Sequence, residues 1–377
     1  MTANMILATR PVILEQWAGG LDRVYELHKW IGAGIVAAVL LHSQIGFEQV
    51  SGVLPPGSIG ETAAEVGELV LWPFVALLML SLIKRIPQLP FEIPYNLWRW
   101  SHRLMGLVFV ALAFHQLFVK APFGPTDLIS QWMIVMALVG SLAFLWTQLG
   151  ARFRTRRYSV AEVEHLPGAT RVRAEPAGRG IRPRAGQFAF LSAARAGLRE
   201  PHPFTVSAIG ESGAVEFCIR PSGDFTRRLR DKLKEGDRLR IEGGYGTFRP
   251  QDGGRKQIWI AGGIGITPFL AAAEALRADD GLEVVLIHAV RDAEDAVGAE
   301  RLKAVAAGVE GFTYRLHDSA TQGRLTGDGV LDLLPFDLRD AQMWFCGPAP
   351  LRKALLAQFK AAGRKPRSVH FERFEFR

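Results

Sequence analysis

The sequence has little cysteine and no recognisable export signal. Cys218 and Cys346 are the only two cysteines among 377 residues, so the chain cannot build a disulfide framework, and both thiols are expected to stay reduced on the cytosolic side. Residues Met1 to Gly20 lack a basic region followed by an apolar core and a small-residue cleavage site, so they do not resemble a cleaved signal peptide. The first segment is therefore expected to be retained.

The sequence also lacks a basic stripe interleaved with aromatic residues, although its formal net charge is +8. Without such a stripe we do not expect nucleic-acid binding. Basic residues gathered at one face of a membrane explain the charge better, because anionic lipid headgroups attract them. The charge therefore predicts a lipid bilayer as a partner of this chain.

Long apolar runs, by contrast, are concentrated in the first 150 residues. Four of them occupy 31–47, 66–83, 104–119 and 128–149. With its flanks, each run approaches the roughly 20 residues that a helix needs to cross a bilayer. Core helices of a large soluble protein are the alternative, but four such runs close together favour a membrane domain. We therefore predict four transmembrane helices.

Charged residues are distributed unequally between the two ends of these runs. One side carries Arg10, Arg23, Lys29, Lys84, Arg85, Arg99, Arg103, Arg152, Arg154, Arg156 and Arg157. The opposite loops carry Glu48, Glu61 and Asp127 but only one basic residue, Lys120. Because membrane proteins place their excess of Lys and Arg on the cytosolic side, both termini are predicted to lie in the cytosol.

Four histidines lie in or beside the first and third apolar runs. His28 and His42 are 14 residues apart, and His102 and His115 are 13 residues apart. One helix separates these two runs, so they are parallel. His28 and His102 would face each other near the cytosolic ends, and His42 and His115 would face each other deeper, towards the outer side. An intramembrane histidine is a functional-site candidate, and two facing imidazoles are what a low-spin b-type haem requires. We predict two stacked b-type haems, with ligands roughly 20 Å apart along each helix.

The spacing in the third run fits a straight helix less well. At about 100° per residue, a step of 14 residues returns to within about 40° of its starting face, whereas a step of 13 ends about 140° away. The third helix is therefore expected to tilt, twist or contain a bulge.

Short β-like stretches replace the apolar runs after Gly150 and the basic segment that follows it. They are Tyr158–Val163, Gln187–Leu191, Phe204–Ala208, Val215–Arg220 and Arg238–Glu242. Their lengths and the turn residues between them predict a small antiparallel barrel. From Gln257 onwards, strands alternate with helices, which is typical of a parallel sheet.

Two segments of the barrel suit a flavin nucleotide. Residues 202–207 offer an aromatic face, hydroxyl groups and backbone on one strand, and such a strand could lie along a flat tricyclic ring. Residues 220–229 place Gly, Thr and cationic side chains at an expected helix start, where backbone N–H groups favour phosphate. An ordinary strand and turn are the alternative for each segment taken alone.

The segment 258–269 contains a buried strand, a glycine turn and then a helix that begins near Pro268. Glycines at such a turn let the backbone approach the phosphates of a dinucleotide, and the helix N-terminus adds partial positive charge. The segment 345–348 is another strand end, with Gly-Pro, and it is expected at the same carboxyl edge of the sheet.

Together, the histidine pairs, the His-Pro-Phe-Thr strand, the Gly-Asp-Phe-Thr turn, the Ala-Gly-Gly-Ile-Gly-Ile-Thr-Pro turn and the Phe-Cys-Gly-Pro segment resemble the ferric reductase/NADPH oxidase superfamily. The resemblance covers nearly the whole chain and is to bacterial members, which fuse a haem-carrying membrane domain to a ferredoxin-reductase-like module. It implies a multi-pass protein of the bacterial inner membrane, with FAD, two b-type haems and NADPH or NADH as cofactors.

The resemblance also implies roles for individual residues. The flavin would be held by His202, Pro203, Phe204, Thr205 and Ser207, with Thr205 near its reactive N5, and its pyrophosphate by Arg220, Gly223, Phe225 and Thr226. The nicotinamide dinucleotide would be held by Gly262, Gly263, Gly265, Thr267 and Pro268, with Cys346, Gly347 and Pro348 lining the nicotinamide pocket. Arg291 would contact an adenosine 2′-phosphate, and Phe376 would cover the flavin ring. A last core strand with alternating aromatic residues is the alternative for the chain end, and both can hold.

One departure from the family concerns the start of the chain. Family members usually carry an additional span before the first haem helix, whereas only Met1 to Gly20 precede it here. Either this is a reduced form or the sequence starts late. The difference leaves both histidine pairs intact, but it would open one side of the haem bundle to lipid or to a partner.

The expected architecture is therefore a multidomain membrane protein. It has an N-terminal segment (1–24), a four-helix haem-binding transmembrane bundle (25–151), an antiparallel β-barrel FAD domain (152–252) and an α/β NAD(P)-binding domain (253–377). We expect it to pass electrons from NAD(P)H through FAD and two haems to an extracytoplasmic small molecule, either dioxygen or ferric iron. Two alternatives stay open: an electron-conduit subunit that serves a periplasmic protein or quinone, and a flavin reductase tethered by haem-free helices.

Overall fold

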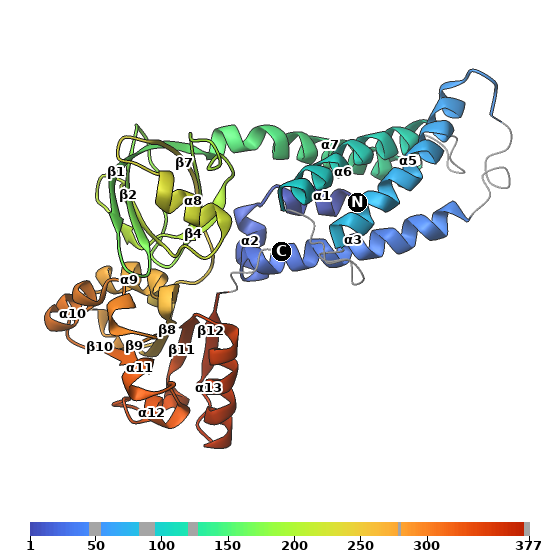
Figure 1. Cartoon of the computed structure of the whole chain (residues 1–377). Helices are drawn as coiled ribbons and strands as arrows, with labels where there is room; N and C mark the ends of the chain where they lie inside the picture. Colours follow the sequence, from blue (N-terminus) through green and yellow to red (C-terminus); the bar gives the residue numbers. More distant parts are fainter. Residues whose placement is uncertain (45–53, 83–94, 120–126, 278–279, 373–377) are drawn as a thin grey trace. The chain divides into compact units, whose positions relative to one another are not determined.

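The computed structural model describes the whole chain except residues 45–53, 83–94, 120–126, 278–279 and 373–377. The chain divides into two compact units, Met1–Arg152 and Phe153–Arg377 (Figure 1). In the first unit, four helices are long and apolar enough to cross a membrane, as the sequence predicts. The two units are described separately below.

The first unit is helical. Its helices are α1 (Thr2–Ala8), α2 (Val12–Ala18), α3 (Leu21–Ser43), α5 (Ile59–Leu82), α6 (Tyr95–Phe118) and α7 (Leu128–Arg154). The two helices that carry the candidate haem ligands begin earlier than their apolar runs, α3 at Leu21 rather than 31 and α6 at Tyr95 rather than 104. Charged residues can continue a helix beyond the hydrocarbon layer, which explains why hydropathy alone placed the starts too late. His28 and His102 consequently lie inside helices.

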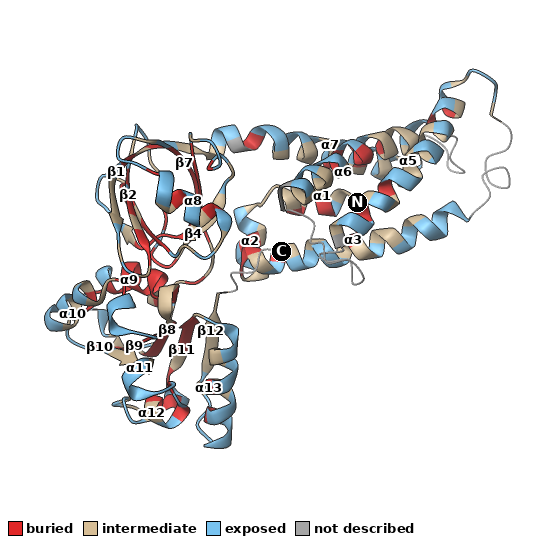
Figure 2. Cartoon of the chain, viewed as in Figure 1, coloured by how far each residue is buried: buried red, intermediate tan, exposed pale blue. Residues whose placement is uncertain are grey.

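Side chains on the outer surface of the four long helices are apolar. Leu69, Trp72, Leu128 and Leu142 are among the large hydrophobic residues that the fold leaves exposed, whereas the buried residues of Figure 2 are concentrated in the sheets. Such a surface is unfavourable in water and matches the apolar interior of a bilayer. This distribution supports the assignment of the helices as membrane spans.

Glycines let α6 and α7 approach each other closely. A Cβ atom at Gly106 of α6 would overlap the ring of Phe144 of α7, and a Cβ atom at Gly140 of α7 would overlap the ring of Phe109 of α6. Each helix thus receives an aromatic ring of the other where it lacks a side chain, the arrangement that small residues permit between membrane helices. In α5, Pro73 lies inside the helix and removes one backbone hydrogen bond.

The segment before the first span is itself ordered, which the sequence did not predict. Helix α1 packs against α3, and the Asn4 amide donates a hydrogen bond to the backbone carbonyl of His28 at 3.1 Å. The hydroxyl of Thr2 donates to the carbonyl of Met136 in α7 at 2.9 Å. Helix α1 therefore bridges two of the spans.

The second unit begins with a curled antiparallel sheet in the order β4-β3-β7-β1-β2-β6-β5. Its strands are β1 (Arg156–His165), β2 (Thr170–Pro176), β3 (Phe188–Ala193), β4 (His202–Thr205), β5 (Ala208–Ile209), β6 (Val215–Ile219) and β7 (Arg238–Tyr245), with helix α8 (Asp224–Lys232) between the last two. Leu191, Phe217 and Leu239 are fully buried in the core that the sheet encloses. This confirms the predicted antiparallel FAD-type fold.

Two details of the sheet differ from the prediction. The expected strand Phe204–Ala208 is divided into β4 and β5, because the Val206 amide donates to Gln187 and the Ser207 amide donates to Glu216. Strand β2 was not predicted, since charged residues alternate with small ones along it. Its burial nevertheless alternates, with the small residues inside.

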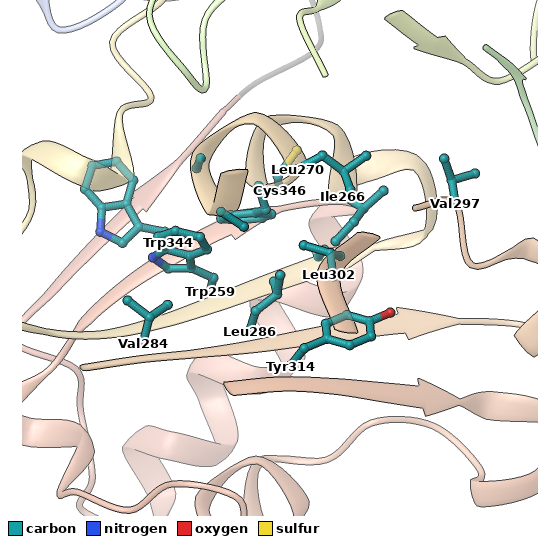
Figure 3. Packing of buried hydrophobic residues seen from close by; sticks show 14 of the residues in the cluster. Trp259, Ile266, Leu270, Val284, Leu286, Val297, Leu302, Tyr314, Trp344 and Cys346 are labelled. Atoms are coloured by element: carbon teal, nitrogen blue, oxygen red, sulfur yellow. The ribbon is translucent and has the colours of Figure 1, made fainter. Parts of the chain in front are cut away.

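A parallel sheet in the order β10-β9-β8-β11-β12 completes the second unit. Its elements are β8 (Lys256–Gly262), α9 (Thr267–Glu274), β9 (Glu283–Val290), α10 (Ala299–Gly308), β10 (Phe312–Asp318), α11 (Ser319–Gln322), α12 (Gly327–Leu331), β11 (Gln342–Cys346), α13 (Ala349–Ala361) and β12 (Ser368–Phe371). Strands β8 and β9 are buried on both faces, as their continuous apolar sequences require. Figure 3 shows Trp259, Leu286 and Tyr314 in the core on one of these faces.

Candidate functional site

The four membrane histidines form the two pairs that their spacing predicts. The ring centroids of His28 and His102 are 5.9 Å apart, and those of His42 and His115 are 6.5 Å apart. A metal–imidazole bond is about 2 Å long, so two imidazoles that share one metal ion have ring centres about 6 Å apart. Both ring separations therefore match that of two imidazoles that would hold one metal ion.

Hydrogen bonds define the tautomer of both α6 histidines. The Nδ1 atom of His115 lies 2.7 Å from the Ala63 carbonyl, which can only accept, so Nδ1 carries the proton. The Nδ1 atom of His102 lies 2.8 Å from the Ser81 hydroxyl, and this hydroxyl uses its own hydrogen on the Leu77 carbonyl at 2.7 Å. Ser81 therefore accepts from His102. In both rings the Nε2 lone pair is left for a metal, as in ligating histidines whose other nitrogen donates to the protein.

On the α3 side of the His28–His102 pair there are a potential donor and a potential acceptor. Among the described residues, neither the Nδ1 atom of His28 nor the Oδ1 atom of Asn4 has a hydrogen-bond partner, and both atoms are buried. The two residues are already joined, because the Asn4 amide donates to the His28 carbonyl. A His28 ring that ligates through Nε2 carries a proton on Nδ1, and the unpartnered Asn4 oxygen is a candidate acceptor for it. The pocket thus suits a metal-bound imidazole.

Helix α6 forms both pairs without the bulge that was one of the expected solutions. It is α-helical from Tyr95 to Phe118, so the rings of His102 and His115 leave it on different sides. Each ring is held by α5 instead. A Cβ atom at Gly67 would overlap the His115 ring, so the absence of a side chain at this position provides the space that His115 occupies.

The candidate flavin residues meet around the start of α8. The ring of Phe225 stacks on His202 with centroids 3.8 Å apart and lies 6.2 Å from the ring of Phe204. Thr205 and Ser207 are buried, and the Ser207 hydroxyl donates to Glu216 at 3.2 Å. The two separate sequence motifs therefore form one aromatic cluster, in which Phe225 itself is buried.

Helix α8 begins with backbone groups arranged for capping. Gly223 is its N-cap, and the Gly223 amide donates to the Thr226 hydroxyl at 2.9 Å. Arg220, which precedes the helix, is exposed and has a guanidinium nitrogen near Gly263. A helix N-terminus beside a free cationic group suits an anionic phosphate.

The two dinucleotide motifs meet at the carboxyl edge of the parallel sheet. Strands β8 and β11 pair with Ala261 opposite Cys346. A Cβ atom at Gly265 would overlap the Cys346 carbonyl, and one at Gly262 would lie 2.6 Å from the Pro348 ring. The turn thus needs glycine because the backbone of the second motif lies against it. Pro268 is in the first turn of α9, where a proline is favourable.

Cys346 is completely buried at the end of β11. Burial raises the pKa of the Cys346 thiol well above its usual value, and the negative charge of Glu372 raises it further. The side chain is therefore a neutral thiol at physiological pH. Arg291 directly follows β9 at the same edge and is exposed, whereas Phe376 lies outside the described residues.

Several of these contacts have no sequence pattern that could reveal them. Ser81 and the Ala63 carbonyl are ordinary positions of an apolar helix, and Gly67 is one glycine among many. Their roles depend on how α5 packs along α6. A glycine or serine facing a predicted ligand across a helix pair is the only hint, and it requires the helix register to be known.

The sequence matches three protein families in consecutive segments. Residues 1–113 match the ferric reductase like transmembrane component, residues 165–253 match an FAD-binding domain, and residues 259–356 match the oxidoreductase NAD-binding domain. This order of domains is that of the ferric reductase/NADPH oxidase superfamily. It establishes that a membrane domain and two nucleotide-binding domains share one chain.

Curated relatives and solved structures resemble part of the chain. It is 28% identical over 200 residues to the toluate 1,2-dioxygenase electron transfer component of Pseudomonas putida, an alignment that covers 50% of this chain and 60% of that protein. The cytochrome P450 reductase GcoB of Amycolatopsis is 28% identical, with a TM-score of 0.50, and 59% of this chain matches 70% of that one. The flavohem-like FAD/NAD binding domain of the Vibrio cholerae nitric oxide dioxygenase is 21% identical, with a TM-score of 0.50, over 58% of this chain and 97% of that one, a likeness of fold.

Proposed function

We propose a function from one premise: the chain is a membrane-bound, NAD(P)H-dependent oxidoreductase with the ferric reductase/NADPH oxidase architecture. In our proposal it carries electrons from NAD(P)H through FAD and two b-type haems to an acceptor outside the cytoplasm, either dioxygen or ferric iron. The observation that carries this proposal is the pair of imidazole pairs, each about 6 Å across, in an apolar helical unit.

The cofactors would supply the change from two-electron to one-electron chemistry, because FAD accepts a hydride and haem accepts single electrons. His28 and His102 would hold the inner haem, and His42 and His115 the outer haem. Ser81 and the Ala63 carbonyl would keep the proton of the α6 rings on Nδ1, so that both rings present Nε2 to iron. The surrounding apolar side chains would exclude water from the route.

The second unit would bind the two nucleotides. The aromatic cluster around Phe225 would lie against the flavin, with Thr205 near N5. The start of α8 and Arg220 would bind the pyrophosphate. The remaining residues assigned to the flavin are His202, Pro203, Phe204, Ser207, Gly223 and Thr226. Phe376 would cover the ring.

The glycine turn after β8 would bind the nicotinamide dinucleotide. Gly262, Gly263, Gly265, Thr267 and Pro268 form this turn and the start of α9. Cys346, Gly347 and Pro348 would line the nicotinamide pocket, and the neutral Cys346 thiol suits a site that receives the uncharged dihydronicotinamide ring. Arg291 at the same edge would contact a 2′-phosphate and so favour NADPH over NADH.

We place the chain in the bacterial inner membrane with both termini in the cytoplasm. Arg23 and Lys29 lie near the start of α3, Arg99 and Arg103 near the start of α6, and Arg154 at the end of α7. Antiparallel succession of the helices brings these ends to one face. Cationic residues at one face support a cytoplasmic location for that face.

A second function is favoured by the names of the relatives. The Pseudomonas putida protein is an electron transfer component of a dioxygenase, and the Amycolatopsis protein is a cytochrome P450 reductase. By analogy, this chain would deliver electrons to a periplasmic redox protein or quinone. In that case purified protein would oxidise NADPH only slowly until membrane extract is added.

The test begins with the full chain purified in detergent. We expect a Soret band, an electron paramagnetic resonance spectrum of low-spin bis-histidine haem, and bound FAD. Oxidation of NADPH and NADH is then measured under air and, without oxygen, with ferric citrate. Cytochrome c reduction that superoxide dismutase suppresses would identify dioxygen as the acceptor. A folded, FAD-containing preparation reconstituted with haem that shows no bis-histidine spectrum would refute the proposal and leave the tethered flavin reductase.

A further inference from the structure

His288 is a fully buried histidine that none of the assignments above uses. It lies in β9 opposite Ala261 of β8, one residue before the end of the neighbouring strand. Its Nε2 atom is 3.1 Å from the carbonyl oxygen of Gly263, in the glycine turn. Its Nδ1 atom is 3.2 Å from the hydroxyl of Tyr314 in β10.

These contacts have a defined direction. The Gly263 carbonyl can only accept, so the proton of His288 is on Nε2, and Nδ1 accepts the hydroxyl hydrogen of Tyr314. Burial lowers the pKa of His288 to about 4, and burial raises the pKa of Tyr314. Both groups are therefore neutral at physiological pH. The chain of donors runs from Tyr314 through His288 to Gly263, inside the core that Figure 3 shows around Tyr314.

Fixing this carbonyl fixes the direction of the next backbone amide. A peptide unit is planar, and its C=O and N–H bonds point in opposite directions. When His288 holds the Gly263 carbonyl towards the sheet, the N–H of Ile264 is directed the other way. Gly263 itself has a φ angle of +55°, in the left-handed region that favours glycine. Because glycine has no side chain, Gly263 cannot hold the turn through a side-chain contact of its own.

The turn is thereby held from two strands. The backbone of Cys346 and Gly347 in the β11 segment lies against Gly265 and Gly262, which limits movement on that side. On the β9 side, the hydrogen bond from His288 is the contact that orients Gly263. Without it, only the short 3-10 turn Gly263–Ile266 would hold the peptide between Gly263 and Ile264, and glycine allows many backbone conformations.

We propose that His288 is a positioning residue for NAD(P)H: it orients the glycine turn so that backbone N–H groups face the dinucleotide phosphates, without touching the nucleotide itself. This inference rests on the proposed role of the turn in nucleotide binding. It predicts that loss of His288 weakens binding of the reduced dinucleotide and leaves the chemistry of the bound complex unchanged.

The test compares four variants of the full chain with the wild type, using steady-state NADPH oxidation with ferricyanide as acceptor. His288→Leu is expected to raise the KM for NADPH about five- to tenfold, the effect of one hydrogen bond to a binding element, with kcat within about twofold. His288→Gln should recover part of the affinity, because its amide can donate to Gly263 and its oxygen can accept from Tyr314. Tyr314→Phe should have a smaller effect of the same kind.

His317→Leu is the matched control. This histidine lies in the neighbouring strand β10 and its Nε2 atom is 2.9 Å from a glycine carbonyl, that of Gly323, but it is outside the glycine turn. Its replacement should leave the KM unchanged. Thermal melting and FAD content are recorded for every variant, so that a folding defect is recognised.

Two results would overturn the proposal. The first is an unchanged KM in a folded His288→Leu variant. The second is a parallel fall in kcat and FAD content that His288→Gln does not correct, since that pattern indicates a purely structural role. Failure of the proposed function is seen separately, because a wild-type chain that reacts with NADPH but transfers no electrons to haem would leave these comparisons of KM intact.

Discussion

The first unit, which contains the membrane helices, and the second unit, which contains the two sheets, hold their candidate ligands in different ways. In the helices, the candidate binding groups are four side chains on an apolar scaffold, and two of them, His102 and His115, are each oriented by a single hydrogen bond to α5. In the second unit, the candidate site at the parallel sheet is mostly backbone, shaped by glycines that allow two loops to touch. A side-chain site should fail through loss of one functional group, whereas a backbone site should fail when an atom is added.

The largest effect is expected from removing a candidate ligand. His115→Ala should abolish the outer haem and lower electron transfer across the membrane more than a hundredfold, while reduction of FAD by NADPH continues. Haem per protein would fall from two to one by pyridine haemochrome absorbance, and stopped-flow absorbance would follow the flavin. His165→Ala, in β1, should change neither quantity. Full haem content in the His115 variant would contradict the ligand assignment.

The corresponding change in the second unit, Gly265→Ala, adds a single methyl group. In Gly265→Ala the new Cβ atom would overlap the Cys346 carbonyl, so the two loops must separate. We expect NADPH affinity to fall at least tenfold with haem content unchanged, measured by titration of flavin reduction. Gly308→Ala is the control, because nothing lies within 4 Å of a Cβ atom at that position. Equal affinities of the two variants would show that the close approach is unimportant.

A smaller effect is expected where the backbone shapes the membrane site. Gly67→Ala would press on the His115 ring and move it from the Ala63 carbonyl. The affinity of the outer site for haem should fall about tenfold, the scale typical of contacts that orient metal ligands. The inner haem should be retained. Gly34→Ala in α3 meets open space and serves as the control. An unaltered haem spectrum in the Gly67→Ala variant would show that the site does not require glycine at position 67.

The smallest effect is expected from the hydrogen bond to His102. Ser81→Ala removes the acceptor for Nδ1 but leaves the ligating nitrogen, so both haems should be retained and the reduction potential of the inner haem should shift. A spectroelectrochemical titration would resolve one moved and one unmoved midpoint. Ser43→Ala, whose hydroxyl donates only to Leu40 in its own helix, should move neither. A shift of both midpoints would argue against a local effect.

The sequence alone was sufficient for the spans, the histidine pairs and the order of the domains, because hydropathy and residue spacing report directly on helices. Strand β2 escaped prediction, since charged residues hide its alternation. Contacts between elements were also inaccessible. Nothing in the sequence indicates that Asn4 lies beside His28, or that His288 reaches Gly263, because these contacts depend on packing between distant segments.

The assignment of individual residues to cofactors stays a prediction. The structure brings His202 and Phe225 together, and it places the glycine turn against Cys346–Pro348. The second of these proximities follows from the fold, in which ligands gather at the carboxyl ends of parallel strands. Which atoms a nucleotide contacts depends on the bound state, and Phe376 lies outside the described residues.

The proline within α5 has a consequence for how the two histidine pairs are adjusted. Ala63 and Ser81, the two hydrogen-bond partners on α5, are 18 residues apart, a whole number of turns, so they lie on the same side of the helix roughly 27 Å from each other. Pro73 is close to the midpoint between them. A helix that is weakened there can bend, and each half can then follow its own histidine. A straight rod would instead pass a displacement at one histidine pair on to the other, so we expect this single ring to reduce the mechanical coupling between the two pairs.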